Sequence, residues 1–189
     1  MIGDSIVFWA GQSEPRCTST GCLKWLGVRG AHLSALTSIL HRHISRHPVP
    51  HTVIVHLGTN DLFSIPLKDI RISIEGGLNS IRHLLPNTTI IWSDILLRLF
   101  YFGEQKQGVG KKCVLSLNKF AHKLCSNLGN AHAIVHSHNI NPSQHSLYYR
   151  DGLHLSSSGN VLFQENLHNA LAFFALYPEA LLYPSHSSK

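Results

Sequence analysis

Short β-branched runs alternate in this chain with longer segments in which apolar residues recur at helical spacing. Residues 52–57, Thr-Val-Ile-Val-His-Leu, form the clearest run of strand length, and similar runs occupy 88–92 and 131–136. The segments of helical period are 31–46, 70–85, 114–128 and 156–176. Strands that alternate with helices in this way predict a parallel sheet with right-handed crossovers and helices on both faces. The expected fold class is therefore α/β.

The chain is long enough for one domain with a substantial core. It has 189 residues, of which 43% are hydrophobic, and no linker or repeat divides it. We expect one domain over residues 1–177 and a flexible tail over 178–189. No stretch of about 18 uncharged apolar residues predicts a membrane span, and no basic and apolar leader opens the chain. These features favour a cytoplasmic protein.

Composition does not favour a nucleic-acid partner, a metal or a cofactor. The net charge is +6, but only 14% of the residues are charged, and the nearest basic cluster is Lys106, Lys111 and Lys112. Fifteen histidines are present without the spacing of metal ligands. The four cysteines, Cys17, Cys22, Cys113 and Cys125, also lack metal-ligand spacing. They are expected to be reduced thiols, with a Cys17–Cys22 bridge as the less favoured alternative.

Three polar motifs lie at predicted strand ends or in loops. They are Gly3-Asp4-Ser5, Gly58-Thr59-Asn60-Asp61 and Asp151-Gly152-Leu153-His154. In an open parallel sheet, ligands bind beyond the carboxyl ends of the strands, so the predicted topology gathers the three motifs at one edge. Each motif alone is as well explained by an ordinary turn or helix cap.

Together, the three motifs contain the groups that acyl transfer requires. A serine hydroxyl such as that of Ser5 needs a base to take its proton, and His154 can serve if Asp151 fixes its tautomer. Negative charge that develops on the carbonyl oxygen needs preorganised donors. The Ser5 N–H, a glycine N–H and the Asn60 amide can supply three of them.

These motifs resemble the sequence blocks of the SGNH (GDSL) hydrolase family, and the resemblance spans almost the whole chain. The four blocks stand here as Gly3-Asp4-Ser5, Gly27-Val28-Arg29-Gly30, Gly58-Thr59-Asn60-Asp61 and Asp151-Gly152-Leu153-His154. The resemblance implies a flavodoxin-like, three-layer α/β/α sandwich and hydrolysis of carboxylic esters without a metal. It also implies Ser5 as nucleophile, His154 as general base and Asp151 as its orienting partner.

The resemblance further implies an oxyanion hole made of Ser5, Gly30 and Asn60, with Gly27 as the alternative to Gly30. The expected substrate is a short acyl or acetyl ester of a small molecule, lipid or carbohydrate. Substrate choice is expected to depend on the loops at residues 12–26 and 100–112.

The chain departs from the family pattern at its first strand, because only Met1 and Ile2 precede Gly3. We therefore expect a largely missing first strand, an open trough beside the strand after Gly27 or the 52–57 strand, and a poorly held Ser5. Residues 5–10 and 27–30 are also similar to esterase-like domains of vertebrate retroelements. The alternative to an enzyme is accordingly a degenerate, non-catalytic SGNH-fold module of retroelement origin that binds an anionic partner.

Overall fold

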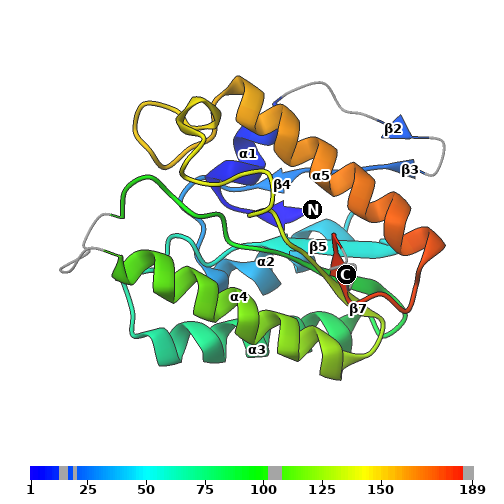
Figure 1. Ribbon diagram of the computed structural model, residues 1–189. Coiled ribbons are helices and arrows are strands. Elements are labelled where there is room, and N and C mark those ends of the chain that lie inside the picture. The colour runs from blue at the N-terminus through cyan, green and yellow to red at the C-terminus, as the bar shows by residue number, and fades with distance from the viewer. Residues whose placement is uncertain (13–16, 19–20, 102–107, 185–189) are drawn as a thin grey trace.

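Six parallel strands form one sheet at the centre of the molecule (Figure 1). The computed structural model describes residues 1–12, 17–18, 21–101 and 108–184. The strand order is β4-β1-β5-β6-β7-β8. Their bounds are β1 Ile2–Gly3, β4 Leu26–Gly27, β5 Thr52–His56, β6 Thr89–Ser93, β7 Ala131–Ile134 and β8 Leu182–Tyr183. The α/β class and the parallel sheet predicted from the sequence are confirmed.

Helices cover both faces of the sheet and complete the three layers (Figure 1). The helices of one face are α1 Ser5–Ala10 and α5 Ser157–Leu176, and those of the other are α2 Leu36–Ile44, α3 Leu67–Leu84 and α4 Val109–Leu128. Short 3₁₀ turns, η1 Leu33–Ala35 and η2 His145–Leu147, precede α2 and α5. In α3 the predicted spacing is realised, because Ile70, Ile74, Leu78 and Ile81 are all buried against the sheet.

The two-residue strand β1 lies in the middle of the sheet. Ile2 and Gly3 pair with β4 on one side and with β5 on the other. The Leu26 N–H donates to the Met1 carbonyl at 2.8 Å, and the Val28 N–H donates to the Gly3 carbonyl at 2.9 Å. β1 is two residues long, but the expectation that Ser5 is poorly held is wrong. Backbone pairing on both sides fixes the residues directly before it.

Part of the expected flexible tail is a strand. Leu182–Tyr183 forms β8, which pairs with β7 at the edge of the sheet. The Ala133 N–H donates to the Leu181 carbonyl and the Val135 N–H to the Tyr183 carbonyl, both at 2.7 Å. The prediction of a tail from residue 178 is therefore wrong for these residues, because β7 offers an edge that the sequence pattern does not reveal. Residues 185–189 lie outside the described residues.

The cysteines are not all reduced. Cys22 is disulfide-bonded, whereas Cys113 and Cys125 are free thiols. The loop expected at residues 12–26 contains a small antiparallel hairpin of β2 Cys17–Thr18 and β3 Gly21–Cys22. In that hairpin the backbones of Cys17 and Cys22 lie directly opposite each other. The expectation of four reduced thiols is wrong, since the antiparallel register was not evident from the sequence.

Among the described helices, none is both long enough and apolar enough to cross a membrane.

Candidate active site

The candidate site lies where the strand order of the sheet reverses. The chain runs from β1 outward to β4 and then returns past β1 to β5, so the loops after these strands diverge. Ligands of open α/β sheets bind at such a point. Gly3-Asp4-Ser5 leaves β1, Gly27–Gly30 continues from β4, and Gly58–Asp61 follows β5. Three motifs that are far apart in sequence thereby reach one edge of the sheet.

Ser5, His154 and Asp151 form a continuous chain of hydrogen bonds. The Ser5 Oγ lies 3.0 Å from Nε2 of His154, although the two residues are 149 positions apart. Nδ1 of His154 lies 2.7 Å from Oδ2 of Asp151. The His154 and Asp151 side chains are 32% and 35% exposed, so the site is open to solvent. The structure thus brings together the three residues that the sequence nominated.

Asp151 is held by the backbone of its own loop. Its Oδ1 accepts the N–H of Leu153 at 2.9 Å and that of His154 at 3.0 Å. Partial burial acts to raise the pKa of Asp151, but hydrogen bonds from the His154 side chain and these two N–H groups lower it below its ordinary value. Asp151 is therefore an ionised acceptor that favours a proton on Nδ1 of His154 and leaves Nε2 free to accept.

Asn60, a candidate oxyanion donor, is hydrogen-bonded to the residue that follows the other candidate, Gly30. The Asn60 amide donates to the Ala31 carbonyl at 2.9 Å, which leaves its second N–H available. The neighbouring Asp61 accepts the Leu33 N–H at 3.1 Å and lies 3.3 Å from Nδ1 of His32. These bonds fasten the segment after Gly30 to the turn that carries Asn60.

The surroundings of Gly27 and Gly30 differ sharply. A Cβ on Gly27 would overlap the backbone of Phe8, so this position is glycine because α1 packs directly on β4. Gly30 has a φ of +72°, and a Cβ there would meet nothing within 4 Å. The backbone at Gly30 is thus open, while that at Gly27 is covered. This difference favours Gly30 as the donor.

Asp4 lies beneath the nucleophile and is completely buried. Its Oδ1 caps α1 by accepting the Ile6 N–H at 2.9 Å, whereas no described residue hydrogen-bonds its Oδ2. Burial raises the pKa of Asp4 from 3.8 to about 6, against the Ile6 hydrogen bond and the positive charges of Arg98 and His154. Asp4 is therefore a structural residue, and its burial makes its ionisation costly.

Replacing Asp4 by Asn is expected to change how stability depends on pH. Because the folded pKa is the higher one, ionisation of Asp4 destabilises the fold progressively as pH rises from about 4 to about 6. A shift of this size corresponds to about 3 kcal/mol. Asn keeps the acceptor for Ile6 but does not ionise. The free energy of unfolding of Asp4→Asn relative to wild type should therefore rise by up to that amount between pH 4 and pH 7.

Denaturant unfolding of both proteins across this range measures the difference directly. Only the difference is informative, because burial lowers the pKa of His56 to about 4, which makes wild-type stability rise with pH over the same interval. A difference that stays constant from pH 4 to pH 7 would show that Asp4 does not titrate there in the folded protein.

A second serine–histidine pair lies inside the core and was not anticipated from the sequence. The Ser93 Oγ is 2.8 Å from Nε2 of His136 and 3.0 Å from Nδ1 of His56. Ser93 and His136 are fully buried, and the other ring nitrogen of His136 faces the Asn166 amide rather than a carboxylate. Burial lowers the pKa of His136 well below its ordinary value. The signal for this pair in the sequence was no more than polar residues at strand ends, and both of its side chains are buried.

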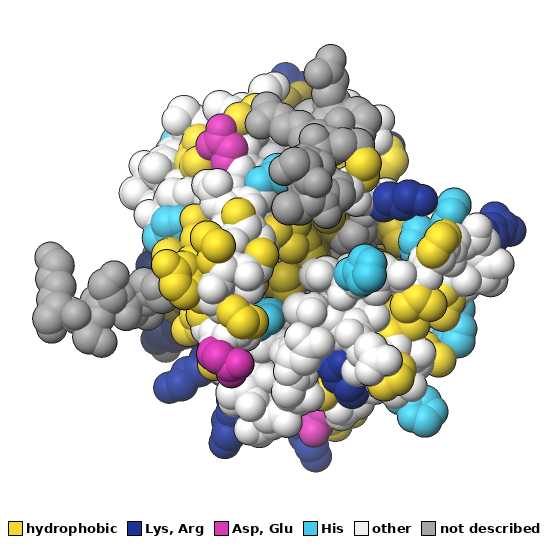
Figure 2. Space-filling model, turned by 90° about the vertical axis from the view of Figure 1, so that its right-hand side faces the viewer, with side chains coloured by type: hydrophobic (Ala, Val, Ile, Leu, Met, Phe, Trp, Pro, Cys, Tyr) yellow, Lys and Arg dark blue, Asp and Glu magenta, His cyan; other side chains and the backbone are white. Residues whose placement is uncertain are grey.

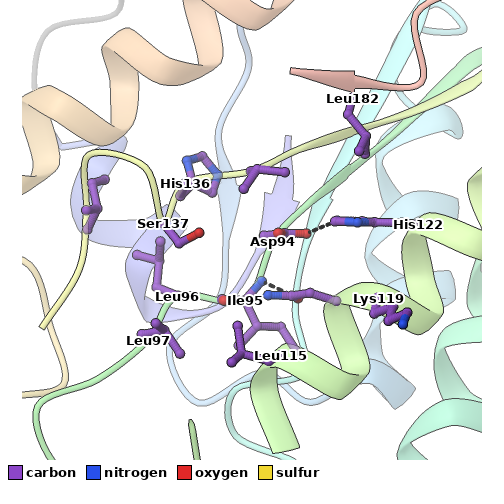
Figure 3. Close-up of a pocket in the computed structure, with 13 residues that line it drawn as sticks. Asp94, Ile95, Leu96, Leu97, Leu115, Lys119, His122, His136, Ser137 and Leu182 are labelled. Atoms are coloured by element: carbon purple, nitrogen blue, oxygen red, sulfur yellow. Dashed lines mark hydrogen bonds and ion pairs between the residues drawn. The ribbon is translucent and has the colours of Figure 1, made fainter. Parts of the chain in front are cut away.

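A cavity of about 190 Å³ lies beside this pair, between the carboxyl ends of β6 and β7 and helix α4 (Figure 3). Asp94 and His122 border it and are joined by a contact of 2.7 Å between Oδ1 and Nε2. Its other walls are mostly apolar and include Leu97, Leu115 and Leu182. Neither Ser5 nor His154 lines this cavity, so it is separate from the candidate site. Over the described residues, no group of three or more His, Cys, Asp or Glu side chains could hold a metal ion.

No protein-family model and no curated protein matches this chain. Solved structures do match. A Streptococcus pneumoniae protein described as a platelet activating factor has a TM-score of 0.70 and 24% identity over 90% of this chain and 81% of its own. A family 3 carbohydrate esterase of Talaromyces cellulolyticus has a TM-score of 0.64 and 14% identity over 92% and 95%.

The esterase domain of the zebrafish ZfL2-1 ORF1 protein, from a retrotransposon, has 23% identity over 91% and 96%. Its TM-score of 0.46 is too low to bear on the retroelement alternative. The other two similarities extend over most of each chain and agree with the parallel sheet and its two helical layers. This chain therefore has the α/β fold of the SGNH-type esterases and acylhydrolases.

Proposed function

We propose that this protein is a serine hydrolase of carboxylic esters. The observation that carries the proposal is the hydrogen-bonded chain from Asp151 through His154 to Ser5, at 2.7 and 3.0 Å, in a solvent-accessible position. Neither the fold nor the motifs alone would support it, because one fold hosts many functions. The geometry of nucleophile, base and orienting carboxylate is the more specific sign.

In the proposed reaction, the Ser5 Oγ attacks the ester carbonyl carbon while Nε2 of His154 takes the hydroxyl proton. The carbonyl oxygen becomes an oxyanion, which the Ser5 N–H, the Gly30 N–H and the Asn60 amide stabilise. His154 then gives its proton to the departing alcohol as the carbon–oxygen bond breaks and an acyl-serine remains. Water, activated by His154, hydrolyses the acyl-serine and regenerates Ser5.

A short acyl group, such as acetyl, suits this site. The exposed His154 and Asp151 side chains leave the nucleophile in an open position, whereas a long acyl chain needs an enclosed apolar channel. Among the structural neighbours, one is a family 3 carbohydrate esterase and another is an acetyl esterase. Residues 13–16, 19–20 and 102–107, in the two loops expected to select the substrate, lie outside the described residues.

Labelling with a serine-reactive fluorophosphonate tests whether the site is assembled. We expect stoichiometric modification of Ser5 in wild type, none in Ser5→Ala, and unchanged modification in Ser93→Ala. Ser93 is a suitable control because it also contacts a histidine, but in the core. Absence of labelling in a folded wild-type protein would contradict the proposal and favour the non-catalytic module.

Replacing Asn60 by Ala is expected to lower kcat by about 10²- to 10³-fold with little change in KM. The reason is that an oxyanion donor acts mainly in the transition state. Asn60 also donates a hydrogen bond to the Ala31 carbonyl, so its loss can destabilise the fold. The kinetics are therefore measured at a temperature at which circular dichroism shows the variant to be folded. Asp61→Asn is the matched control, since it weakens the same turn but removes no donor. Equal decreases of kcat in the two variants would mean that Asn60 affects catalysis only by holding the turn in place.

A further inference from the structure

A larger hollow lies at the amino-terminal edge of the sheet, and the smaller cavity beside Asp94 lies at the carboxyl edge. The larger one, of about 530 Å³, opens next to β1 and is lined by Ile2 and Val53 among others. Figure 2 shows this hollow with a largely hydrophobic floor. It is the open trough expected beside the 52–57 strand. The smaller cavity is the more specific of the two, because a buried charge borders it.

The cavity beside Asp94 combines apolar walls with a buried carboxylate (Figure 3). Leu97, Leu115 and Ile140 are among its apolar lining residues, and Asp94, which is only 6% exposed, borders it directly. Apolar walls with a few placed polar groups are typical of small-molecule sites. An apolar cavity of about 150 Å³ holds benzene. A cavity of about 190 Å³ therefore has room for a ligand of similar size.

Only one of the two carboxylate oxygens of Asp94 is paired. Its Oδ1 lies 2.7 Å from Nε2 of His122, whereas no described residue hydrogen-bonds its Oδ2. Unlike Oδ2 of Asp4, this oxygen is not sealed from solvent, so it opens on the cavity that Asp94 lines. Burial raises the pKa of Asp94, and the hydrogen bond and charge of His122 only partly oppose this effect. The ionised carboxylate is therefore incompletely compensated.

The backbone around this carboxylate is held in place before any ligand binds. The Asn118 side chain accepts the Ile95 N–H at 2.9 Å and donates to the Ile95 carbonyl at 3.0 Å. Further along the same segment, the Tyr148 hydroxyl donates to the Leu97 carbonyl at 2.8 Å. These bonds fix the residue after Asp94 and one apolar wall of the cavity. Such preorganisation reduces the entropic cost of binding.

The chemistry of the cavity favours a cation with a small apolar body. A primary ammonium group has N–H donors that can pair with the open oxygen of Asp94. A neutral hydroxyl group could donate one hydrogen bond but would leave the carboxylate charge uncompensated, and an anion would be repelled. Lys119 also lines the cavity, but it is exposed, and among the described residues the ion pair of Asp94 is with His122.

We infer that this cavity binds a small primary amine in its ammonium form. The ammonium group donates to Oδ2 of Asp94, and an apolar body about the size of benzene packs against Leu97 and Leu115. Neither Ser5 nor His154 lines the cavity, so the inference does not depend on the proposed esterase activity.

Titration of the full chain with benzylamine, followed by saturation-transfer NMR, tests this inference. Near neutral pH benzylamine is positively charged, as a lysine side chain is. We expect saturable binding at one molecule per chain and a rise in Tm that grows with benzylamine concentration. Benzyl alcohol has the same ring and nearly the same size but no charge. It should bind at least tenfold more weakly, because a hydrogen bond between charged groups is the stronger one.

Two variants locate the binding. Asp94→Asn keeps an acceptor for His122 but has no negative charge, so it should bind benzylamine at least tenfold more weakly and lose the preference over benzyl alcohol. Leu115→Trp should abolish binding of both compounds by filling the cavity. Its matched control is Ile72→Trp, since Ile72 is likewise an exposed apolar residue but lies on α3 and does not line the cavity.

Three results would overturn the inference. The first is no saturable binding of benzylamine by the folded chain. The second is equal affinity for benzylamine and benzyl alcohol, which would mean that the cavity binds the ring alone. The third is unchanged affinity in Asp94→Asn, which would place the amine elsewhere. The comparison of the two compounds uses wild-type protein only, so the test holds even if a variant does not fold.

Discussion

Ser5→Ala is expected to lower kcat for a short-chain aryl ester by 10⁴-fold or more, on the order of what loss of a serine nucleophile costs elsewhere. The alanine methyl group cannot attack a carbonyl, while the backbone N–H of residue 5 and the Asn60 amide remain in place. Binding of substrate should therefore change little. Steady-state hydrolysis of aryl acetate by the purified protein measures the effect.

Two companion variants make this result specific. Ser93→Ala removes the other histidine-bound hydroxyl and should retain activity within a few-fold, with some loss of stability because His56 and His136 lose a partner. The double variant Ser5→Ala/His154→Ala should be no slower than Ser5→Ala alone, since residues that act as a unit are not additive. If Ser93→Ala were the inactive variant and Ser5→Ala the active one, the assignment of the site would be wrong.

Asp151→Asn is expected to lower kcat by about 10⁴-fold near neutral pH while preserving the fold. The amide oxygen of Asn can still accept the N–H groups of Leu153 and His154. Its NH₂ group, however, would face Nδ1 of His154, which must then be the acceptor. The ring proton moves to Nε2 and faces the Ser5 hydroxyl, so His154 cannot take the hydroxyl proton.

The matched control is Asp94→Asn. Asp94 also lies 2.7 Å from a histidine, His122, but it is buried, and this pair does not include Ser5 or His154. Asp94→Asn should therefore keep wild-type kcat. The role assigned to Asp151 requires the two variants to differ in kcat. A kcat for Asp151→Asn within tenfold of wild type would show that tautomer control by Asp151 is unnecessary.

Much of the fold was predictable because it depends on local patterns. The β-branched run at 52–57 became β5, and the apolar residues spaced around Ile74 became the buried face of α3. Helix and strand periods are properties of neighbouring residues, so a sequence reveals them. The candidate triad was also predictable, since Ser5, Asp151 and His154 stand in short motifs with recognisable spacing. The structure joins them by hydrogen bonds.

The errors concern segments whose structure is set by distant partners. Two residues, Ile2 and Gly3, have too little local preference to declare a strand, and pairing with β4 and β5 on both sides makes them one. Leu182 and Tyr183 are a strand only because β7 presents an edge to them. The disulfide at Cys22 depends on a hairpin register that composition does not specify.

The sequence by itself determined the alternation of strands and helices and the residues able to form a serine hydrolase site, because both are encoded in short-range patterns of side-chain type. Only the tertiary structure decided which of these residues lie together. It separated an accessible Ser5–His154 pair from a buried Ser93–His136 pair, and an open Gly30 from a covered Gly27. Burial and long-range pairing follow from how the whole chain packs, and no local pattern contains them.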